Sequence, residues 1–282
     1  MDSSAGAEAD RAQAFPANST NQDIIMNPSS RLHNKVAIVT GASSGIGRAT
    51  AKLFAAEGAR LVVAARRQAE LDSLVAEIEA AGGVAVALAG DVQSEAFAQA
   101  LVELAESRFG RLDIAFNNAG TLGEMGPSTG ISADGWNEAL STNLTSAFYG
   151  AKHQLAAMLK TGAGSIIFTS TFVGHTFAFP GVAAYAASKS GLIGLTQALA
   201  AEYGPQGIRV NAILPGAVDT EMYRSMNSTA EAQSFVTNLH ALKRLATPEE
   251  LARSVLYLAS EDSSFVTGTA SLVDGGASIT RT

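Results

Sequence analysis

Residues 36–47, VAIVTGASSGIG, decide the fold. The first five are apolar or β-branched, as in a buried strand, and the next carry glycines at 41, 45 and 47 before a helical pattern that ends at Gly58. Free N–H groups and the dipole at the start of such a helix attract a pyrophosphate, and glycines let it approach the backbone. The stretch therefore predicts a dinucleotide-binding strand–turn–helix unit, with an ordinary glycine-rich turn as the alternative, because the spacing is not G-x-G-x-x-G.

The same alternation of short apolar runs and helical stretches continues to the end of the chain. Further strands are expected at 60–66, 84–90, 112–120, 164–170, 208–216 and 269–276. Parallel strands need helical crossovers and are buried on both faces. The pattern thus predicts an α/β, Rossmann-like, doubly wound fold with a mostly parallel seven-stranded sheet and helices on both faces. Without an internal linker, residues 31–282 should form a single dinucleotide-binding catalytic domain after a polar, disordered tail at 1–30.

Composition narrows the classes of partner. The net charge is −7 and the 19 basic residues are scattered, which argues against nucleic acid. The chain has no cysteine, and its four histidines are too far apart in sequence for a local metal-ligand motif, so no metal is predicted. Without a signal sequence or a run of 18 apolar residues, the protein is expected to be cytoplasmic, with no membrane partner.

Residues 183–192, AAYAASKSGL, place a phenol and an ammonium among small side chains. Tyr185 and Lys189 are four apart, so on a helix they project from the same face. One interpretation is a surface pair without function. The other is that the positive charge favours tyrosinate and lowers a pKa that starts near ~10.

The end of the second expected strand bears on the cofactor. In dinucleotide folds an acid at this place binds the ribose 2′-hydroxyl, and an arginine there accommodates a 2′-phosphate instead. Here Ala65 stands where the acid is expected and is followed by Arg66 and Arg67. The sequence therefore favours NADP(H) over NAD(H), unless both arginines merely cover the edge of the sheet.

Seven motifs, in order, resemble those of the short-chain dehydrogenase/reductase family. They are TGASSGIG at 40–47, GDV at 90–92, NNAG at 117–120, STNL around Asn143, SIIFTST at 165–171, YAASK at 185–189 and PGAVDT at 215–220. The resemblance covers nearly all of residues 33–280, and several motifs in order are far more specific than any one.

The resemblance implies a role for each matching residue. Tyr185 would be the general acid/base, Lys189 would bind the nicotinamide ribose and lower the pKa of Tyr185, and Asn143 would hold a water that links Lys189 to solvent. The expected cofactor-binding set is Gly41, Ser43, Ser44, Gly45, Ile46 and Gly47 in the glycine loop, Arg66, Asp91 and Val92 at the adenosine, Asn118, Ala119 and Gly120 in the segment 117–120 that supports the strand beside the cofactor, and Tyr185, Lys189, Pro215, Gly216, Val218 and Thr220. Of the last group, Thr220 and the backbone near Val218 would contact the nicotinamide carboxamide.

One position departs from the family pattern. The family's substrate-binding serine usually lies 13 residues before the tyrosine, where this chain has Phe172. An insertion of one residue would align Thr171 instead, with Ser170 beside it. Only one of two successive strand residues can face the site. Ser170 is slightly preferred as the freer hydroxyl, and both stay candidates.

The resemblance implies an NADP(H)-dependent oxidoreductase that interconverts a secondary alcohol and a ketone. Two alternatives stay open: a 3-oxoacyl thioester (acyl carrier protein) reductase, and a non-catalytic NADP(H)-binding sensor on the same fold. The expected partners are a small carbonyl or alcohol substrate and further copies of the chain in a homo-oligomer, a dimer or tetramer. An apolar pocket is expected from Phe172, Phe177, Phe179, Met222, Tyr223 and Met226.

Overall fold

The computed structural model describes residues 31–280, so the expected tail at 1–30 lies outside the described residues. A seven-stranded sheet forms the centre of the molecule, in the order β3-β2-β1-β4-β5-β6-β7. Every neighbouring pair is parallel, which confirms the predicted doubly wound sheet. The strands are β1 Val36–Thr40, β2 Arg60–Ala65, β3 Val84–Ala89, β4 Ile114–Asn117, β5 Gly164–Thr169, β6 Ile208–Pro215 and β7 Ala270–Val273.

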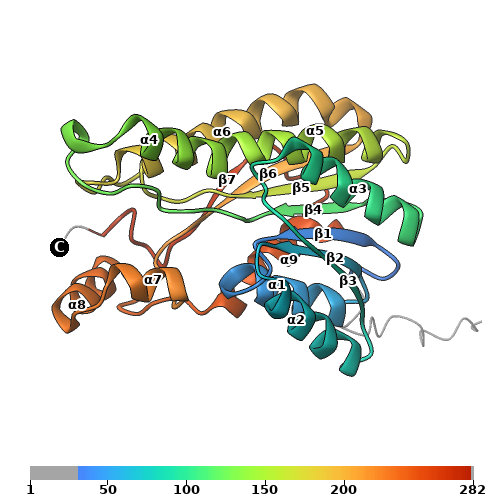
Figure 1. Cartoon of the computed structure of the whole chain (residues 1–282), viewed down its shortest axis with the longest axis horizontal. Helices are drawn as coiled ribbons and strands as arrows, with labels where there is room; N and C mark the ends of the chain where they lie inside the picture. Colours follow the sequence, from blue (N-terminus) through green and yellow to red (C-terminus); the bar gives the residue numbers. More distant parts are fainter. Residues whose placement is uncertain (1–30, 281–282) are drawn as a thin grey trace, which may run out of the picture.

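Helices cover both faces of the sheet (Figure 1). One layer contains α3 Glu95–Phe109, α5 Ser146–Leu159 and α6 Ala183–Tyr203; the other contains α1 Gly45–Ala56, α2 Gln68–Ala80 and α9 Pro248–Ala259. Successive strand residues alternate between the two cores, so that Ile38 packs under α3 and α5 while Val39 packs against α1 and α9. Burial on both faces explains why these strands are continuous apolar runs.

Two strands end earlier than expected because side chains take over their backbone hydrogen bonds. β4 ends at Asn117, since the N–H groups of Asn118 and Ala119 donate to the Thr40 hydroxyl. β7 ends at Val273, where the Asp274 carboxylate accepts the N–H groups of Gly276 and Ser278. Both turns carry the chain away from the sheet at its carboxyl end.

The remaining helices lie near that end. They are α4 Ala133–Leu140, the π-helical turn η2 Ser141–Thr145, α7 Glu221–Met226 and α8 Ala230–Leu239, with 3₁₀ turns η1 Ser128–Gly130, η3 Gly204–Gln206 and η4 Glu261–Ser263 elsewhere. α7 and α8 project beyond the carboxyl ends of the strands, outside both helical layers (Figure 1). Among the helices that the structure describes, none is long and apolar enough to span a membrane.

Candidate active site

A cleft of about 1100 Å³ opens at the carboxyl ends of the strands. Strands β1 to β6 each contribute residues at or just beyond their ends: Gly41, Ala65, Gly90, Asn118, Thr169 and Pro215. The opposite wall comes from α7, α8 and the loop between β5 and α6. The strand order reverses between β1 and β4, which is the topological switch point where open α/β sheets bind ligands.

The glycine loop after β1 forms a cradle for an anion. Gly41 and Gly45 have φ of +66° and +54°, a backbone conformation that favours glycine. A Cβ on Gly47 would lie 2.3 Å from the Gly41 carbonyl oxygen, so the loop could not close over a side chain there. α1 starts at Gly45 without a side-chain cap or an acid in its first turn, which leaves its N–H groups and dipole available to a phosphate.

Two exposed arginines line the cleft just after β2, where the adenosine was expected. Arg67 donates to the Ser43 hydroxyl at 3.2 Å and forms an ion pair with Glu221 at 3.7 Å, so it spans from the glycine loop to α7. Arg66 lines the same end, beside Asp91 and Val92. Ala65 ends β2 where an acid for a ribose 2′-hydroxyl is expected, and Arg66 follows it, while Asp91 follows β3.

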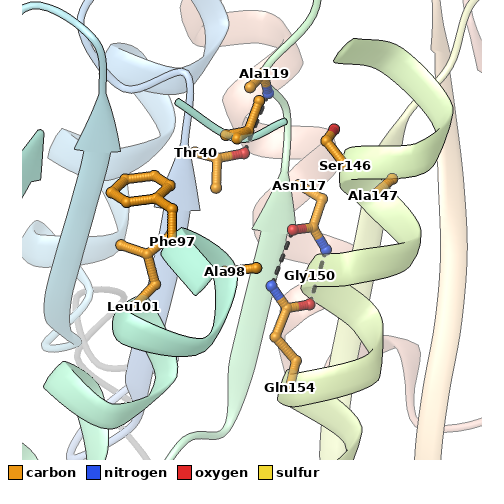
Figure 2. A pocket seen from close by; sticks show the side chains of 11 residues that line it. Thr40, Phe97, Ala98, Leu101, Asn117, Ala119, Ser146, Ala147, Gly150 and Gln154 are labelled. Atoms are coloured by element: carbon orange, nitrogen blue, oxygen red, sulfur yellow. Dashed lines mark hydrogen bonds between the residues drawn. The ribbon is translucent and has the colours of Figure 1, made fainter. Parts of the chain in front are cut away.

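The turn after β4 is anchored from two sides. Thr40 accepts the N–H groups of Asn118 and Ala119 at 3.0 and 3.2 Å, and Asn118 donates to the Thr40 carbonyl at 3.2 Å. Asn117 turns away from the cleft and pairs with Gln154 of α5 through two reciprocal amide hydrogen bonds of 2.9 Å (Figure 2). Asn117 thus supports the strand, while Asn118, Ala119 and Gly120 line the cleft.

Lys189 is buried, and its ammonium donates to the Thr169 carbonyl at 2.7 Å. Burial without a carboxylate partner lowers its pKa to about 8. A Cβ on Gly120 would lie 3.0 Å from both Lys189 Nζ and Asn143 Oδ1, so both side chains lie close to the backbone of Gly120.

Asn143 lies in the π-helical turn η2 between α4 and α5 and is also buried. Its Oδ1 accepts the Thr121 N–H, and its Nδ2 donates to the Thr121 carbonyl and to the Ser188 hydroxyl, all at 2.8–2.9 Å. Isolated π-turns inside helices are frequent at functional sites. This one joins Asn143 to the helix of Tyr185 and to the turn after β4.

Tyr185 lines the cleft from the first turn of α6. Burial raises the pKa of its phenol, and the neighbouring Thr171 hydroxyl opposes part of that rise. The pKa of Tyr185 is thus raised, whereas the resemblance implied that Lys189 lowers it; the Lys189 ammonium donates to the Thr169 carbonyl. The phenol is therefore protonated at neutral pH.

The structure separates the two hydroxyls that the sequence left open. Ser170 donates to the Lys189 backbone carbonyl at 2.7 Å, which commits its hydroxyl to holding α6 against β5. Thr171 instead has its hydroxyl beside the Tyr185 phenol. Both residues line the cleft, but the slight preference for Ser170 is not supported, since its hydroxyl is held by the Lys189 carbonyl rather than free. Because β5 ends at Thr169, strand alternation does not decide between them.

The loop after β6 lines the cleft where the nicotinamide was expected. Pro215, Gly216, Val218 and Thr220 line the cleft, as expected. The Thr220 methyl packs over the glycine loop, where a Cβ on Gly45 would lie 3.1 Å from it. The Thr220 hydroxyl caps α7 by accepting the Tyr223 N–H at 3.2 Å.

Apolar side chains form the remaining walls. Phe172, Phe177 and Phe179 pack on one another, with ring centroids 4.8–6.2 Å apart. Phe172 and Phe179 line the cleft with Met222, Tyr223 and Met226, so the expected apolar lining is found except for Phe177, which lies behind it. α8 adds Phe235, Val236 and Leu239, which the sequence analysis had not selected.

Most of the predicted site residues therefore meet in one cleft. Gly47 and Asn143 lie directly behind its surface rather than on it. Sequence analysis missed the Thr40 hydroxyl and the Thr169 carbonyl, which only the parallel register brings to the site. In the part of the chain from 31 to 280, no group of three histidines or carboxylates is arranged as a metal site.

Known proteins resemble this chain along most of its length. A family model described as Enoyl-(Acyl carrier protein) reductase matches residues 41–278. Cyclohexanol dehydrogenase of Acinetobacter sp. (strain SE19) is 40% identical over 247 residues, which cover 88% of this chain and 96% of the relative.

Solved structures agree with the sequence comparisons. The crystal structure of levodione reductase has a TM-score of 0.85 and 34% identity, covering 89% of this chain and 100% of that one. A putative NAD(P)-dependent gluconate 5-dehydrogenase from Beutenbergia cavernae, with NADP bound at low occupancy, has a TM-score of 0.83 and 36% identity, covering 89% and 98%. This chain belongs to the short-chain dehydrogenase/reductase family of oxidoreductases.

Proposed function

We propose that the protein is an NADP(H)-dependent oxidoreductase that interconverts an uncharged, largely apolar secondary alcohol and the corresponding ketone. The observation that carries the proposal is the convergence of Thr171, Tyr185 and Lys189 on one cleft, whose glycine loop is built for a dinucleotide. A bound nicotinamide dinucleotide supplies or accepts the hydride.

The cofactor site fits a phosphorylated dinucleotide. The cradle at Gly41, Gly45 and Gly47, with the uncapped start of α1, suits the pyrophosphate. Arg66 lies at the position from which a guanidinium accommodates a 2′-phosphate. The Beutenbergia relative with bound NADP supports the same choice.

The protein's own residues would handle the proton. The protonated phenol of Tyr185 can donate to a ketone oxygen, and Thr171 beside it can hydrogen-bond the same oxygen. Lys189 would hold the ribose hydroxyls, and its ammonium favours transient tyrosinate. Asn143, which like Lys189 lies close to the backbone of Gly120, is placed to order a water on the path from Lys189 to solvent.

The charges of the cleft define the substrate. Its charged side chains are Arg66, Arg67, Asp91, Glu138, Lys189 and Glu221. Arg66, Arg67 and Asp91 follow β2 and β3 at the adenosine end, and Glu221 pairs with Arg67. The β5–α6 loop and α8 line the cleft with uncharged residues, so a carboxylate or phosphate on the substrate would find no cation there.

The uncharged wall of the cleft also weighs against a thioester reductase for acyl carrier protein, although the matching family model is described as an Enoyl-(Acyl carrier protein) reductase. A phosphopantetheine arm and an acidic carrier call for basic residues at the mouth. Arg224 is paired with Asp219, and Arg244 with Glu250. A sensor without turnover has no use for the phenol, ammonium and hydroxyl together.

Cofactor titration followed by turnover tests the proposal. NADPH and NADH binding is measured by fluorescence, and then oxidation of NADPH with cyclohexanone and other neutral ketones is followed in the wild type and in Arg66→Ala. Tighter binding of NADPH than NADH, lost in Arg66→Ala while NADH binding is kept, supports the cofactor assignment. Binding without turnover on any ketone would favour the sensor, and equal affinity for both cofactors would contradict NADP(H) preference.

A further inference from the structure

His240 is a buried histidine outside the set that handles the proton. It follows the last residue of α8 and is 2% exposed. Its two ring nitrogens contact two different parts of the cleft wall. Nδ1 lies 2.9 Å from the Val236 carbonyl within α8, and Nε2 accepts the Ala217 N–H at 3.0 Å from the loop after β6.

These contacts fix the tautomer. A carbonyl oxygen only accepts a hydrogen bond, so the proton lies on Nδ1, and Nε2 offers its lone pair to Ala217. Among the described residues, His240 is the hydrogen-bond acceptor of the Ala217 N–H. The imidazole is therefore a bridge of defined polarity, with a donor toward α8 and an acceptor toward the loop.

The ring packs closely against the backbone of two glycines. A Cβ on Gly216 would lie 2.8 Å from His240 Nε2, and a Cβ on Gly275 would lie 3.4 Å from the ring carbon Cδ2. The ring thus packs between the loop after β6 and the turn after β7, and glycines at 216 and 275 admit it.

Both ends of the bridge belong to the cleft. Phe235, Val236 and Leu239 of α8 line its apolar wall, and Pro215, Gly216, Ala217 and Val218 line the end where the nicotinamide would lie. We propose that His240 is a positioning residue, which as a neutral imidazole couples the substrate-lining helix α8 to the cofactor-binding loop 215–218. This rests on the proposed function, because it assumes that the loop contacts the cofactor.

The coupling has a direct consequence for binding order. A ligand that fixes the loop also fixes α8, since the imidazole transmits the position of Ala217 to Val236. NADPH binding should therefore order α8 before the ketone arrives. Without the Nε2 acceptor of His240, NADPH should bind without ordering α8.

Two substitutions of similar polarity test the bridge. His240→Asn keeps an amide near the place of Nδ1 but is too short to accept from Ala217, whereas His240→Gln restores an acceptor near the place of Nε2. An unpaired buried N–H weakens the loop, so His240→Asn should raise the Kd for NADPH roughly tenfold. His240→Gln should stay within about threefold of wild type, because the acceptor is restored. Thermal unfolding of each variant is recorded as a check on folding.

Amide hydrogen exchange supplies the second readout. In the ligand-free wild type the Ala217 amide should exchange slowly, and NADPH should slow exchange in α8 of the wild type and of His240→Gln but not of His240→Asn. Equal defects in both variants, wild-type affinity in His240→Asn, or rapid exchange at Ala217 would overturn the coupling. Failure of the wild type to bind NADPH or NADH would instead overturn the proposed function, while exchange at Ala217 still tests the bridge.

Discussion

Tyr185 keeps its proton and Lys189 is close to losing one, although they are a single helical turn apart on α6. Burial acts on both, but it disfavours the charged form of each, which raises the phenol pKa and lowers the ammonium pKa. In the proposed reaction the protonated phenol would act as an acid on a ketone. Its conversion to a base for alcohol oxidation depends on stabilisation of the tyrosinate by the ammonium.

Tyr185→Phe should abolish turnover while leaving the cofactor site formed. General acid catalysis contributes roughly 10²–10⁴ in rate, so kcat should fall by about that factor. The Kd for NADPH should change by less than about threefold, since the phenyl ring preserves the packing. Single-turnover rates and fluorescence titration measure the two quantities, and turnover within tenfold of wild type would reject Tyr185 as the acid.

Thr171→Ala and Ser170→Ala form a matched pair. Thr171 faces the Tyr185 phenol, so its loss should lower kcat/KM by roughly tenfold or more with little change in stability. Ser170 binds the Lys189 carbonyl, so its loss should lower the free energy of unfolding by about 1–3 kcal/mol. Kinetics and denaturant unfolding of both variants distinguish the roles, and the reverse pattern would exchange them.

Lys189→Met should abolish activity without destabilising the ligand-free protein at pH 7. The Lys189 pKa falls from 10.5 to about 8 on folding, a cost of about 3 kcal/mol below pH 8. Because the unfolded chain binds more protons between pH 8 and 10.5, the stability of the wild type should rise relative to that of Lys189→Met across this window.

Unfolding midpoints from pH 7 to 10 measure that trend, with Lys152→Met as control. Lys152 is half-exposed and pairs with Glu95, so its substitution should change stability by less than about 1 kcal/mol at either pH. A large loss of stability in Lys189→Met at pH 7 would mean that its bond to the Thr169 carbonyl outweighs the cost of burial.

At the scale of elements, the glycine turn and α1 act as one unit. Gly47→Ala would place a methyl 2.3 Å from the Gly41 carbonyl and 2.7 Å from Asn118 Nδ2, so the cradle must open. The Kd for NADPH should rise by roughly tenfold or more, because the N–H groups no longer converge on the phosphates.

Gly194→Ala in α6 is the matched control. A Cβ at Gly194 has no atom within 4 Å, so the substitution should stabilise the helix by about 0.5–1 kcal/mol and leave NADPH affinity unchanged. NADPH titration and thermal unfolding are measured for both variants. Loss of affinity in Gly47→Ala alone would show a steric effect on the glycine loop, whereas loss in both would show that alanine is poorly tolerated in general.

The presence of the strands and helices could be predicted from the sequence better than their exact bounds. The buried strands are continuous apolar runs, so the sheet and its helices follow from the pattern. Tyr185 and Lys189 as functional residues follow from the resemblance to the family, since helical spacing alone left a surface pair as the other interpretation. The bounds of β4 and β7 do not, because Thr40 and Asp274 take hydrogen bonds that depend on tertiary placement.

The same limit applies to single side chains. The choice between Ser170 and Thr171 depends on where β5 ends, and that end is not visible in the alternation of residues. His240 was one histidine among four, and its bridge joins segments brought together by β6, β7 and α8. The role of Thr169 is carried by its backbone carbonyl, for which side-chain type gives no signal.

For the whole molecule, the distribution of charge along the cleft predicts which ketones are reduced. Arg66 and Arg67 follow β2, the Lys189 ammonium is buried against the Thr169 carbonyl, and the wall from the β5–α6 loop and α8 is uncharged. Cyclohexanone should therefore be reduced with a kcat/KM at least roughly tenfold above that of 4-oxocyclohexanecarboxylate, whose carboxylate would be buried without a partner. Equal kcat/KM values for the two ketones would contradict this prediction, because they would mean that a cation outside the apolar wall pairs with the carboxylate.

The π-helical turn at η2 also constrains how the chain tolerates insertions and deletions. A π-turn holds one residue more than the α-helical turn it replaces. Deleting one residue between Ser141 and Thr145 would remove the widened turn and join α4 to α5 in a regular α-helix. Asn143 would then leave Thr121 and Ser188. Length changes in this segment should therefore be rejected, while the exposed turn around Gly162 accepts them.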